Sequence, residues 1–231
     1  MATMLPQGEE KARAVRAMFD SIAPRYDLVN RVMTFGMDVR WRRRTVRALA
    51  LAPGATVLDL ACGTGDLCRD LSRAGYRAIG ADLSLGMLAH NRSGAPLLQA
   101  DALRLPLADA SVEGAVSGFA LRNFVALAPA FAELARVVQP GGRIALLDVA
   151  KPPGFYFTRV VPRIGGLLSD PAAYRYLPRS VAYLPPPGEI ASLLGAAGFG
   201  TVTRVSLSAG VAQLFVATRA VTTAAERPSA A

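Results

Sequence analysis

A glycine-rich run at residues 59–66, DLACGTGD, has the composition and spacing of a small-molecule binding loop. Gly63 and Gly65 let the backbone approach a ligand closely at a strand-to-helix turn. A dinucleotide site would need a third glycine three residues later; Cys68 stands there, so NAD or FAD is not favoured. Asp59 brings negative charge near the loop, which disfavours a phosphate and favours a cationic ligand.

Two further acids follow the next two expected strands. Asp82 lies 23 residues after Asp59, and Asp101 lies 42 residues after it. A carboxylate at the end of the second strand can accept both hydroxyls of a ribose, and Asp101 would reach an adenine amino group. For any one acid alone, a helix N-cap or a turn is the simpler interpretation. Three acids at successive strand ends, beside the GTG loop, predict a ligand site.

The composition limits the chemistry of such a site. The 231 residues include two cysteines and one histidine. A disulfide framework, a Cys/His zinc site and any serine-hydrolase triad without His90 are therefore excluded or strained, and no metal site is expected. The chemistry must use other groups, or a cofactor that brings its own reactivity.

The elements that must position these residues follow the pattern of an α/β fold. Residues 11–50 have helical periodicity with breaks near Pro24 and Gly36, and short β-rich runs then alternate with helices. This alternation predicts βαβ units and a mostly parallel sheet. A Pro-Gly-Gly run at 140–142 is expected to end a helix, and residues 208–210 to form a hairpin turn. The expected strands are 56–60, 76–81, 97–100, 112–118, 143–150, 201–207 and 211–218, and the later helices are 67–74, 85–91, 127–138 and 189–197.

Positive charge gathers near the N-terminus. The net charge is +9, and residues 11–47 hold ten basic side chains against three acidic ones. A solvated helix face, an anionic membrane surface and a nucleic acid all remain open as explanations. No RNA-binding aromatic motif, helix-turn-helix or zinc finger supports the last.

The sequence shows no targeting or membrane-spanning segment. The first ten residues lack a signal pattern, and the longest uncharged runs are about 14 residues, short of the roughly 18 to 20 that span a bilayer. We therefore expect a cytoplasmic protein that touches a membrane, if at all, as a peripheral protein at its inner face.

The motifs together resemble the class I S-adenosylmethionine-dependent methyltransferases, and more closely the ubiquinone/menaquinone biosynthesis C-methyltransferase family. The likeness extends over about residues 14–217. The class is indicated by DLACGTGD at 59–66, ADLS at 81–84 with GML after it, QADALRLPLAD at 99–109 and the PGG turn. The family is indicated by MFDSIAPRYDLVN at 18–30, FG at 35–36, WR at 41–42, LRN at 121–123, DP at 170–171, YRYL at 174–177 and GF at 198–199.

The resemblance implies a Rossmann-like seven-stranded sheet with the last strand antiparallel, N-terminal helices and a lid inserted after the fifth strand. It also implies S-adenosyl-L-methionine as the cofactor. The family usually has Ser at position 118, so that contact is lost here or passes to Ser117. The positions that would contact the cofactor are Asp59, Gly63, Thr64, Gly65, Asp82, Leu83, Asp101, Ala102, Ser117 and Gly118.

The family's acceptor is a polyprenylated hydroquinone methylated on a ring carbon, which implies a demethylmenaquinone-type or ubiquinone-precursor quinol here. Carbon attack needs an electron-rich ring, best made by removing a phenolic proton. Arg122, with Asn123, is expected to stabilise the phenolate, because a guanidinium stays protonated. Tyr26 is expected to close the site, and Asp148 to position a water. The expected ring pocket contains Tyr174, Tyr176 and Phe119, with core packing under the lid as the alternative for the two tyrosines.

The acceptor half departs from the family pattern. Asp148 and Phe215 stand where a Glu and a His are usual. Three other functions stay open: a methyltransferase of another small aromatic or secondary-metabolite acceptor, a non-catalytic membrane-associated assembly protein that binds the cofactor, and a nucleic-acid methyltransferase. Nucleic-acid binding is expected to be weak and non-specific. Association with further copies of the chain is also left open.

We expect one methyltransferase domain over residues 1–231. Its parts are the basic helices at 11–50, the cofactor-binding core at 51–150, an acceptor lid at 151–188, a C-terminal helix and hairpin at 189–218, and a disordered tail at 219–231. Eight of the 16 prolines lie within 152–187, among tyrosines, phenylalanines and leucines. This composition favours a lid over a linker.

Overall fold

The computed structural model describes residues 7–150 and 180–221. Most of the expected lid, including Tyr174 and Tyr176, lies outside the described residues. So do all but three residues of the expected tail.

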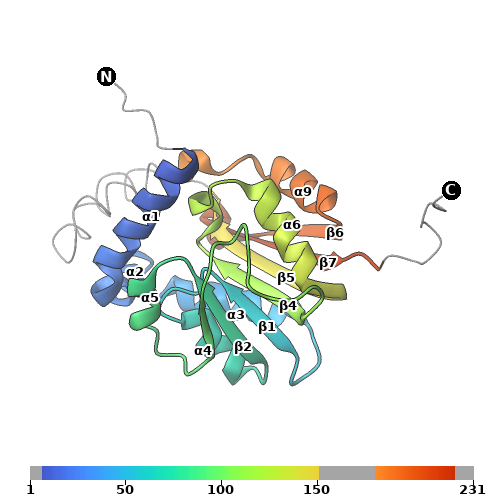
Figure 1. Ribbon diagram of the computed structural model, residues 1–231, viewed down its shortest axis with the longest axis horizontal. Coiled ribbons are helices and arrows are strands. Elements are labelled where there is room, and N and C mark those ends of the chain that lie inside the picture. The colour runs from blue at the N-terminus through green and yellow to red at the C-terminus, as the bar shows by residue number, and fades with distance from the viewer. Residues whose placement is uncertain (1–6, 151–179, 222–231) are drawn as a thin grey trace.

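A seven-stranded sheet forms the centre of the fold, in the order β3-β2-β1-β4-β5-β7-β6 (Figure 1). The strands from β3 to β5 pair in parallel, whereas β7 is antiparallel to both of its neighbours. This arrangement confirms the predicted Rossmann-like sheet with an antiparallel last strand. The strands are β1 (Thr56–Leu60), β2 (Arg77–Asp82), β3 (Leu97–Gln99), β4 (Val112–Gly118), β5 (Val138–Val149), β6 (Phe199–Leu207) and β7 (Ala212–Arg219).

The helices begin and end close to the predicted positions. The first break falls at Pro24 within a 3₁₀ turn, and the second at Gly36, whose φ of +72° favours glycine. Among the described residues, no helix is long and apolar enough to cross a membrane. The helices are α1 (Gly8–Ile22), η1 (Ala23–Arg25), α2 (Tyr26–Met33), α3 (Met37–Leu49), α4 (Asp66–Arg73), α5 (Leu85–Ala89), η2 (Leu121–Asn123), α6 (Leu127–Val137), η4 (Val181–Tyr183), α9 (Pro187–Ala196) and η5 (Ser208–Gly210).

The Pro-Gly-Gly run at 140–142 differs from the prediction, because it lies inside β5 and not at a helix end. Strands β4 and β5 pair on both sides of this run, with a register shift between the paired segments. A Cβ on Gly142 would lie 2.6 Å from the carbonyl oxygen of Glu113, so the irregularity requires glycine there. Strand pairing thus starts at Val138, directly after α6.

Two hydrophobic cores cover opposite faces of the sheet (Figure 1). Helices α6 and α9 pack on one face, and α3 and α4 pack on the other. Side chains alternate along β1, so Leu58 and Leu60 point toward α6 while Val57 points toward α4. Asp59 takes the α4 side by the same alternation. The core side chains of these helices are Phe131, Leu134, Ile190 and Leu194 on the first face, and Trp41, Leu49, Leu67 and Leu71 on the second.

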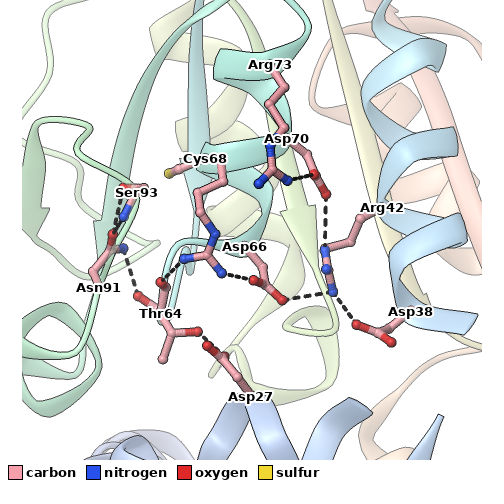
Figure 2. A network of polar contacts seen from close by, with 12 residues as sticks. Asp27, Asp38, Arg42, Thr64, Asp66, Cys68, Asp70, Arg73, Asn91 and Ser93 are labelled. Carbon is pink, nitrogen blue, oxygen red and sulfur yellow. Dashed lines mark hydrogen bonds and ion pairs between the residues drawn. The ribbon is translucent and has the colours of Figure 1, made fainter. Parts of the chain in front are cut away.

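A buried arginine joins α3 to α4 (Figure 2). Arg42 pairs with Asp38 of its own helix, and its side chain lies 3.0 Å from Asp66 Oδ2 and 3.3 Å from Asp70 Oδ2. Asp66 also pairs with Arg69. Because Asp66 is the first residue of α4, directly after the glycine loop, this network fixes the direction in which the helix leaves the loop.

Replacing this arginine should destabilise the fold. Arg42→Met leaves buried carboxylates without their cation, so we expect the free energy of unfolding to fall by about 3 kcal/mol or more in urea titrations. Arg44→Met, at an exposed position of the same helix, should change it by less than about 0.5 kcal/mol. Equal losses in the two variants would contradict a central role for the network.

Candidate active site

A cavity of about 280 Å³ lies at the C-terminal ends of the parallel strands. This is the edge where open α/β sheets bind ligands. The loops after β1, β2, β3 and β4 form its floor, and α1 and α2 cover it. The cavity brings together most of the residues expected from the sequence: Tyr26, Asp59, Gly63, Thr64, Asp82, Leu83, Asp101, Ala102, Gly118, Phe119, Arg122 and Asn123.

The glycine loop is held from both sides. Gly63 and Gly65 have φ angles of +52° and +86°, and a Cβ on Gly65 would lie 2.4 Å from Asn91 Oδ1. Glycine at position 65 therefore lets Asn91 approach and donate its Nδ2–H to the Gly63 carbonyl at 3.0 Å. On the other side, the Gly63 amide donates to Asp82 Oδ2 at 2.8 Å. Gly65 itself supports the loop without lining the cavity.

Asp59 is fully buried at the base of the cavity. Its Oδ2 accepts a hydrogen bond from Cys68 Sγ at 3.2 Å, whereas its Oδ1 has no partner among the residues that the structure describes. Burial raises the pKa of this carboxyl to about 7, against the opposing effect of the Cys68 hydrogen bond. A buried carboxylate oxygen without a partner fits a cationic ligand group such as an ammonium.

Asp82 and Asp101 both bond to the backbone and keep further acceptor capacity. Asp82 takes one amide on each oxygen, from Gly63 and, at 2.8 Å, from Ser84; burial raises its pKa. Asp101 is exposed and accepts the Leu103 amide at 2.9 Å. Both acids therefore stabilise turns, which was the simpler interpretation of each acid alone. Each carboxylate still has lone pairs left for ligand hydroxyl or amino groups.

Helix α1 is fastened to the core by Asp20, an acid to which the sequence reasoning gave no role. Asp20 Oδ1 accepts hydrogen bonds from Ser84 Oγ at 2.5 Å and from the Gly86 amide at 2.9 Å. A Cβ on Gly86 would lie 2.8 Å from the Cα of Asp20, so glycine permits the close approach of α5 to α1. The sequence offers one signal for this contact: Asp20 is one of only three acidic residues among the ten basic ones in residues 11–47.

Two more contacts fasten the N-terminal helices. Asp27 of α2 bonds to the Thr64 hydroxyl of the glycine loop (Figure 2). Lys11 Nζ donates to the Phe124 carbonyl at 2.6 Å and lies 3.9 Å from the centre of the Tyr183 ring. Burial lowers the pKa of Lys11 to about 8. The helices therefore form a fixed wall of the cavity.

Arg122 is buried at the start of the loop after β4. Its Nη1 lies 2.5 Å from Asp148 Oδ1, and its Nε donates to Ser180 Oγ at 3.1 Å. Asp148 also accepts the Val149 amide at 2.7 Å. Asp148 is completely buried and is not among the cavity-lining residues, so its position suits holding Arg122 and not the expected holding of a water.

Tyr26 faces the same part of the cavity as Arg122. Burial raises the pKa of its phenol, with smaller opposing effects from a hydrogen bond with Asn30 and from the charge of Arg122. The Tyr26 hydroxyl thus stays protonated near neutral pH. Its ring packs edge-on against Phe19, with the centroids 6.0 Å apart.

Ser117 lies apart from the other expected cofactor positions. Its hydroxyl is buried, has no partner among the described residues and does not line the cavity. Gly118 does line it, and a Cβ there would lie 2.9 Å from Leu67 Cδ1. Alternation along β4 accounts for the difference, because adjacent residues point to opposite faces of the sheet.

This fold and this site define a class I methyltransferase, the class whose methyl donor is S-adenosylmethionine. A chain in the complex between the Haloferax volcanii Trm112 methyltransferase activator and a methyltransferase has the same fold, with a TM-score of 0.66 and 17% identity over 88% of this chain and 98% of that one. Phosphoethanolamine N-methyltransferase 2 of Haemonchus contortus was solved with S-adenosyl-L-methionine. It matches with a TM-score of 0.59 and 16% identity, over 76% of this chain and 51% of that chain.

Within this class, the chain belongs to the ubiE/COQ5 methyltransferase family, whose model matches residues 6–219. Demethylmenaquinone methyltransferase of Thermus thermophilus is 44% identical over 87% of this chain and 100% of that protein. The ubiquinone/menaquinone biosynthesis C-methyltransferase UbiE of Syntrophotalea carbinolica is 42% identical over 87% and 92%.

The pKa of Asp59 predicts a pH dependence of donor binding. An ammonium group favours the ionised carboxyl, so the donor should bind more tightly as the pH rises through 7, by up to about tenfold per unit on the acid side. Asp59→Asn should weaken binding at pH 8 by about 10- to 100-fold and flatten this dependence. Calorimetric titrations at pH 6, 7 and 8 measure both effects. The amine of the donor titrates in the same way in experiments with either protein, so a difference between the two pH profiles reports on Asp59. Parallel pH profiles for the unmodified protein and Asp59→Asn would contradict the prediction.

Asp82→Ala should weaken donor binding by about 10- to 100-fold, because it removes both the expected ribose acceptor and the partner of the Gly63 amide. Asp109→Ala serves as a control, since this exposed acid precedes β4 at the opposite edge of the sheet. Calorimetry that finds unchanged donor affinity in Asp82→Ala would remove Asp82 from the site.

Proposed function

We propose that the protein transfers a methyl group from S-adenosylmethionine to a ring carbon of a demethylmenaquinone-type quinol. Relatives at 44% and 42% identity are named demethylmenaquinone methyltransferase and ubiquinone/menaquinone biosynthesis C-methyltransferase. The observation that carries the proposal is Arg122, which Asp148 and Ser180 hold on the wall of a largely apolar cavity that Tyr26 also lines.

The donor end of the cavity consists of the glycine loop and the three acids. Asp59 would hold the ammonium group, Asp82 the ribose hydroxyls and Asp101 the adenine amine, while the backbone at Gly63 leaves room beside them. The bound donor supplies a methyl group already activated by a positive sulfur. The chain has to align the two reactants with the reacting atoms about 3 to 3.5 Å apart.

The acceptor end would stabilise a phenolate. Arg122 uses its Nε and one Nη1 bond to Ser180 and Asp148, which leaves further guanidinium N–H donors for an acceptor oxygen. Because Tyr26 stays protonated, its hydroxyl can donate a second hydrogen bond. Phe19 and Phe119 line the same cavity, and their rings would exclude water once the acceptor is bound, which would strengthen both interactions.

The acceptor's prenyl tail is apolar, so we propose that the protein meets it at an anionic membrane surface, on the cytoplasmic side. The basic residues within 11–47 support this part of the proposal. Lys11, Arg13, Arg16 and Arg42 bind groups of the chain itself. The charge available to lipid comes from the exposed arginines of α3, which are Arg40, Arg43, Arg44 and Arg47.

The direct test uses a donor with an isotopically labelled methyl group and demethylmenaquinol. We expect a labelled menaquinone with the label on a ring carbon, measured by mass spectrometry. Donor binding without any methylated quinone would contradict the acceptor, and mass gain on a different aromatic compound would identify the alternative substrate class.

Arg122 should be required for the chemical step. Arg122→Met should lower kcat by about 10²- to 10³-fold with unchanged donor affinity, and the rise of kcat with pH should move to higher pH because the phenolate loses its cation. The double variant Arg122→Met with Asp148→Asn removes both buried charges and controls for misfolding. Arg122→Lys should recover part of the activity. A folded double variant with the kcat and pH profile of the unmodified protein would contradict this role.

A further inference from the structure

Helix α2 and the turn after it expose three apolar side chains, which we call the α2 stripe. Leu28 is 59% exposed, Val32 is 38% exposed, and Phe35, in the turn to α3, is 74% exposed. Leu28 and Val32 are four residues apart and therefore share a face of the helix. A group of exposed apolar side chains of this kind indicates an interaction surface.

The other face of α2 lines the cavity through Tyr26, Asn30 and Met33. At about 100° per residue, Leu28 lies about 200° around the helix from Tyr26. Helix α2 is thus a wall with the cavity on one side and the stripe on the other, and Phe35 both lines the cavity and is exposed. A partner bound to the stripe lies about one helix diameter, roughly 10 Å, from the cavity.

Helix α3 adds a cationic face directly after this turn. Arg40, Arg43, Arg44 and Arg47 follow the i, i+3, i+4, i+7 spacing of one helix face, and all four are exposed. Within residues 7–150 and 180–221, none of these α3 arginines has an acidic partner. The buried Arg42 of the same helix is paired with three carboxylates. The inner face of α3 is therefore neutralised, whereas its outer face keeps the positive charge of the four exposed arginines.

We propose that the α2 stripe and the α3 arginines form one docking surface for an anionic phospholipid bilayer. The stripe inserts among the lipid headgroups, the arginines bind the lipid phosphates, and the apolar acceptor enters the cavity past Phe35. Apolar side chains beside arginines are typical of helices that lie at a membrane interface. A nucleic acid would use the arginines but has no need of the stripe. The route of the acceptor depends on the proposed function, whereas membrane docking does not.

Vesicle flotation tests the docking surface. The full chain should bind vesicles of phosphatidylglycerol with phosphatidylcholine and bind vesicles of phosphatidylcholine alone much more weakly. Leu28→Ser with Val32→Ser should weaken binding about tenfold or more, and Arg43→Glu with Arg44→Glu should do the same. The matched controls are Val221→Ser and Arg77→Glu, two exposed positions at the opposite edge of the sheet; they should bind as the unmodified chain does.

Activity assays distinguish this inference from the proposed function. The double variant Leu28→Ser with Val32→Ser is called the stripe variant. On demethylmenaquinol embedded in anionic vesicles, its kcat/KM should fall in proportion to its loss of vesicle binding. On a water-soluble naphthoquinol without a prenyl tail, it should equal the unmodified chain. If the unmodified chain methylates neither acceptor yet still binds vesicles, the proposed function fails and the docking surface stands.

Three results would overturn the docking surface. One is vesicle binding that neither variant weakens, with unfolding midpoints showing that both are folded. Another is light scattering in which the stripe variant changes a dimer to a monomer while vesicle binding is unaffected, since the occupant is then a second copy of the chain. The third is charge reversal that abolishes binding to RNA but not to vesicles.

Discussion

The hydrogen bond from the Gly63 amide to the Asp82 carboxylate joins the end of β1 to the end of β2. Parallel strands bring their carboxyl ends to one edge, but the loops there must still turn sharply. The glycine loop achieves this with positive φ angles, and Asn91 holds it from the other side. With the loop in place, Asp59 lies beneath the cavity and α4 leaves in the direction that the Arg42 network fixes. The donor end of the site depends on this one turn.

The helices that cover the cavity are held by side chains distant in sequence from the core. Asp20, Asp27 and Lys11 tie the N-terminal helices to three different loops of the core. In each of these contacts, a charged side chain of the N-terminal helices bonds to a hydroxyl, an amide or a carbonyl oxygen of the core. These three charged groups therefore hold the helices in place and do not contribute to the exposed cationic face. This explains how a segment with so many basic residues can cover a ligand cavity and also present a cationic face elsewhere.

Much of this architecture could be predicted from the sequence. The βαβ alternation and the family motifs predicted the sheet, and the acids at strand ends lie around one cavity. The missed features have physical causes. The bulge at Gly142 depends on strand pairing across an irregular register, and the ties of Asp20 and Asp27 depend on how helices pack. Gly118 lines the cavity and Ser117 does not, because adjacent residues of a strand point to opposite faces of the sheet. Whether Asp148 points toward the cavity or toward Arg122 depends on the same alternation, which a shift of one residue in register would reverse.

The scarcity of histidine and cysteine acquires a meaning in this setting. A methyl group on a positive sulfur is already electrophilic, so neither a metal nor a protein nucleophile has to activate it. What the acceptor needs is a fixed cation beside a developing phenolate, in a space without water. In the proposed function, a buried arginine whose orientation is set by a carboxylate and a hydroxyl would meet that need, because guanidinium groups stay protonated in proteins. The proposed reaction would therefore depend on the ion pair of Arg122 with Asp148, and it would need no catalytic histidine or cysteine, residue types that are rare in this sequence.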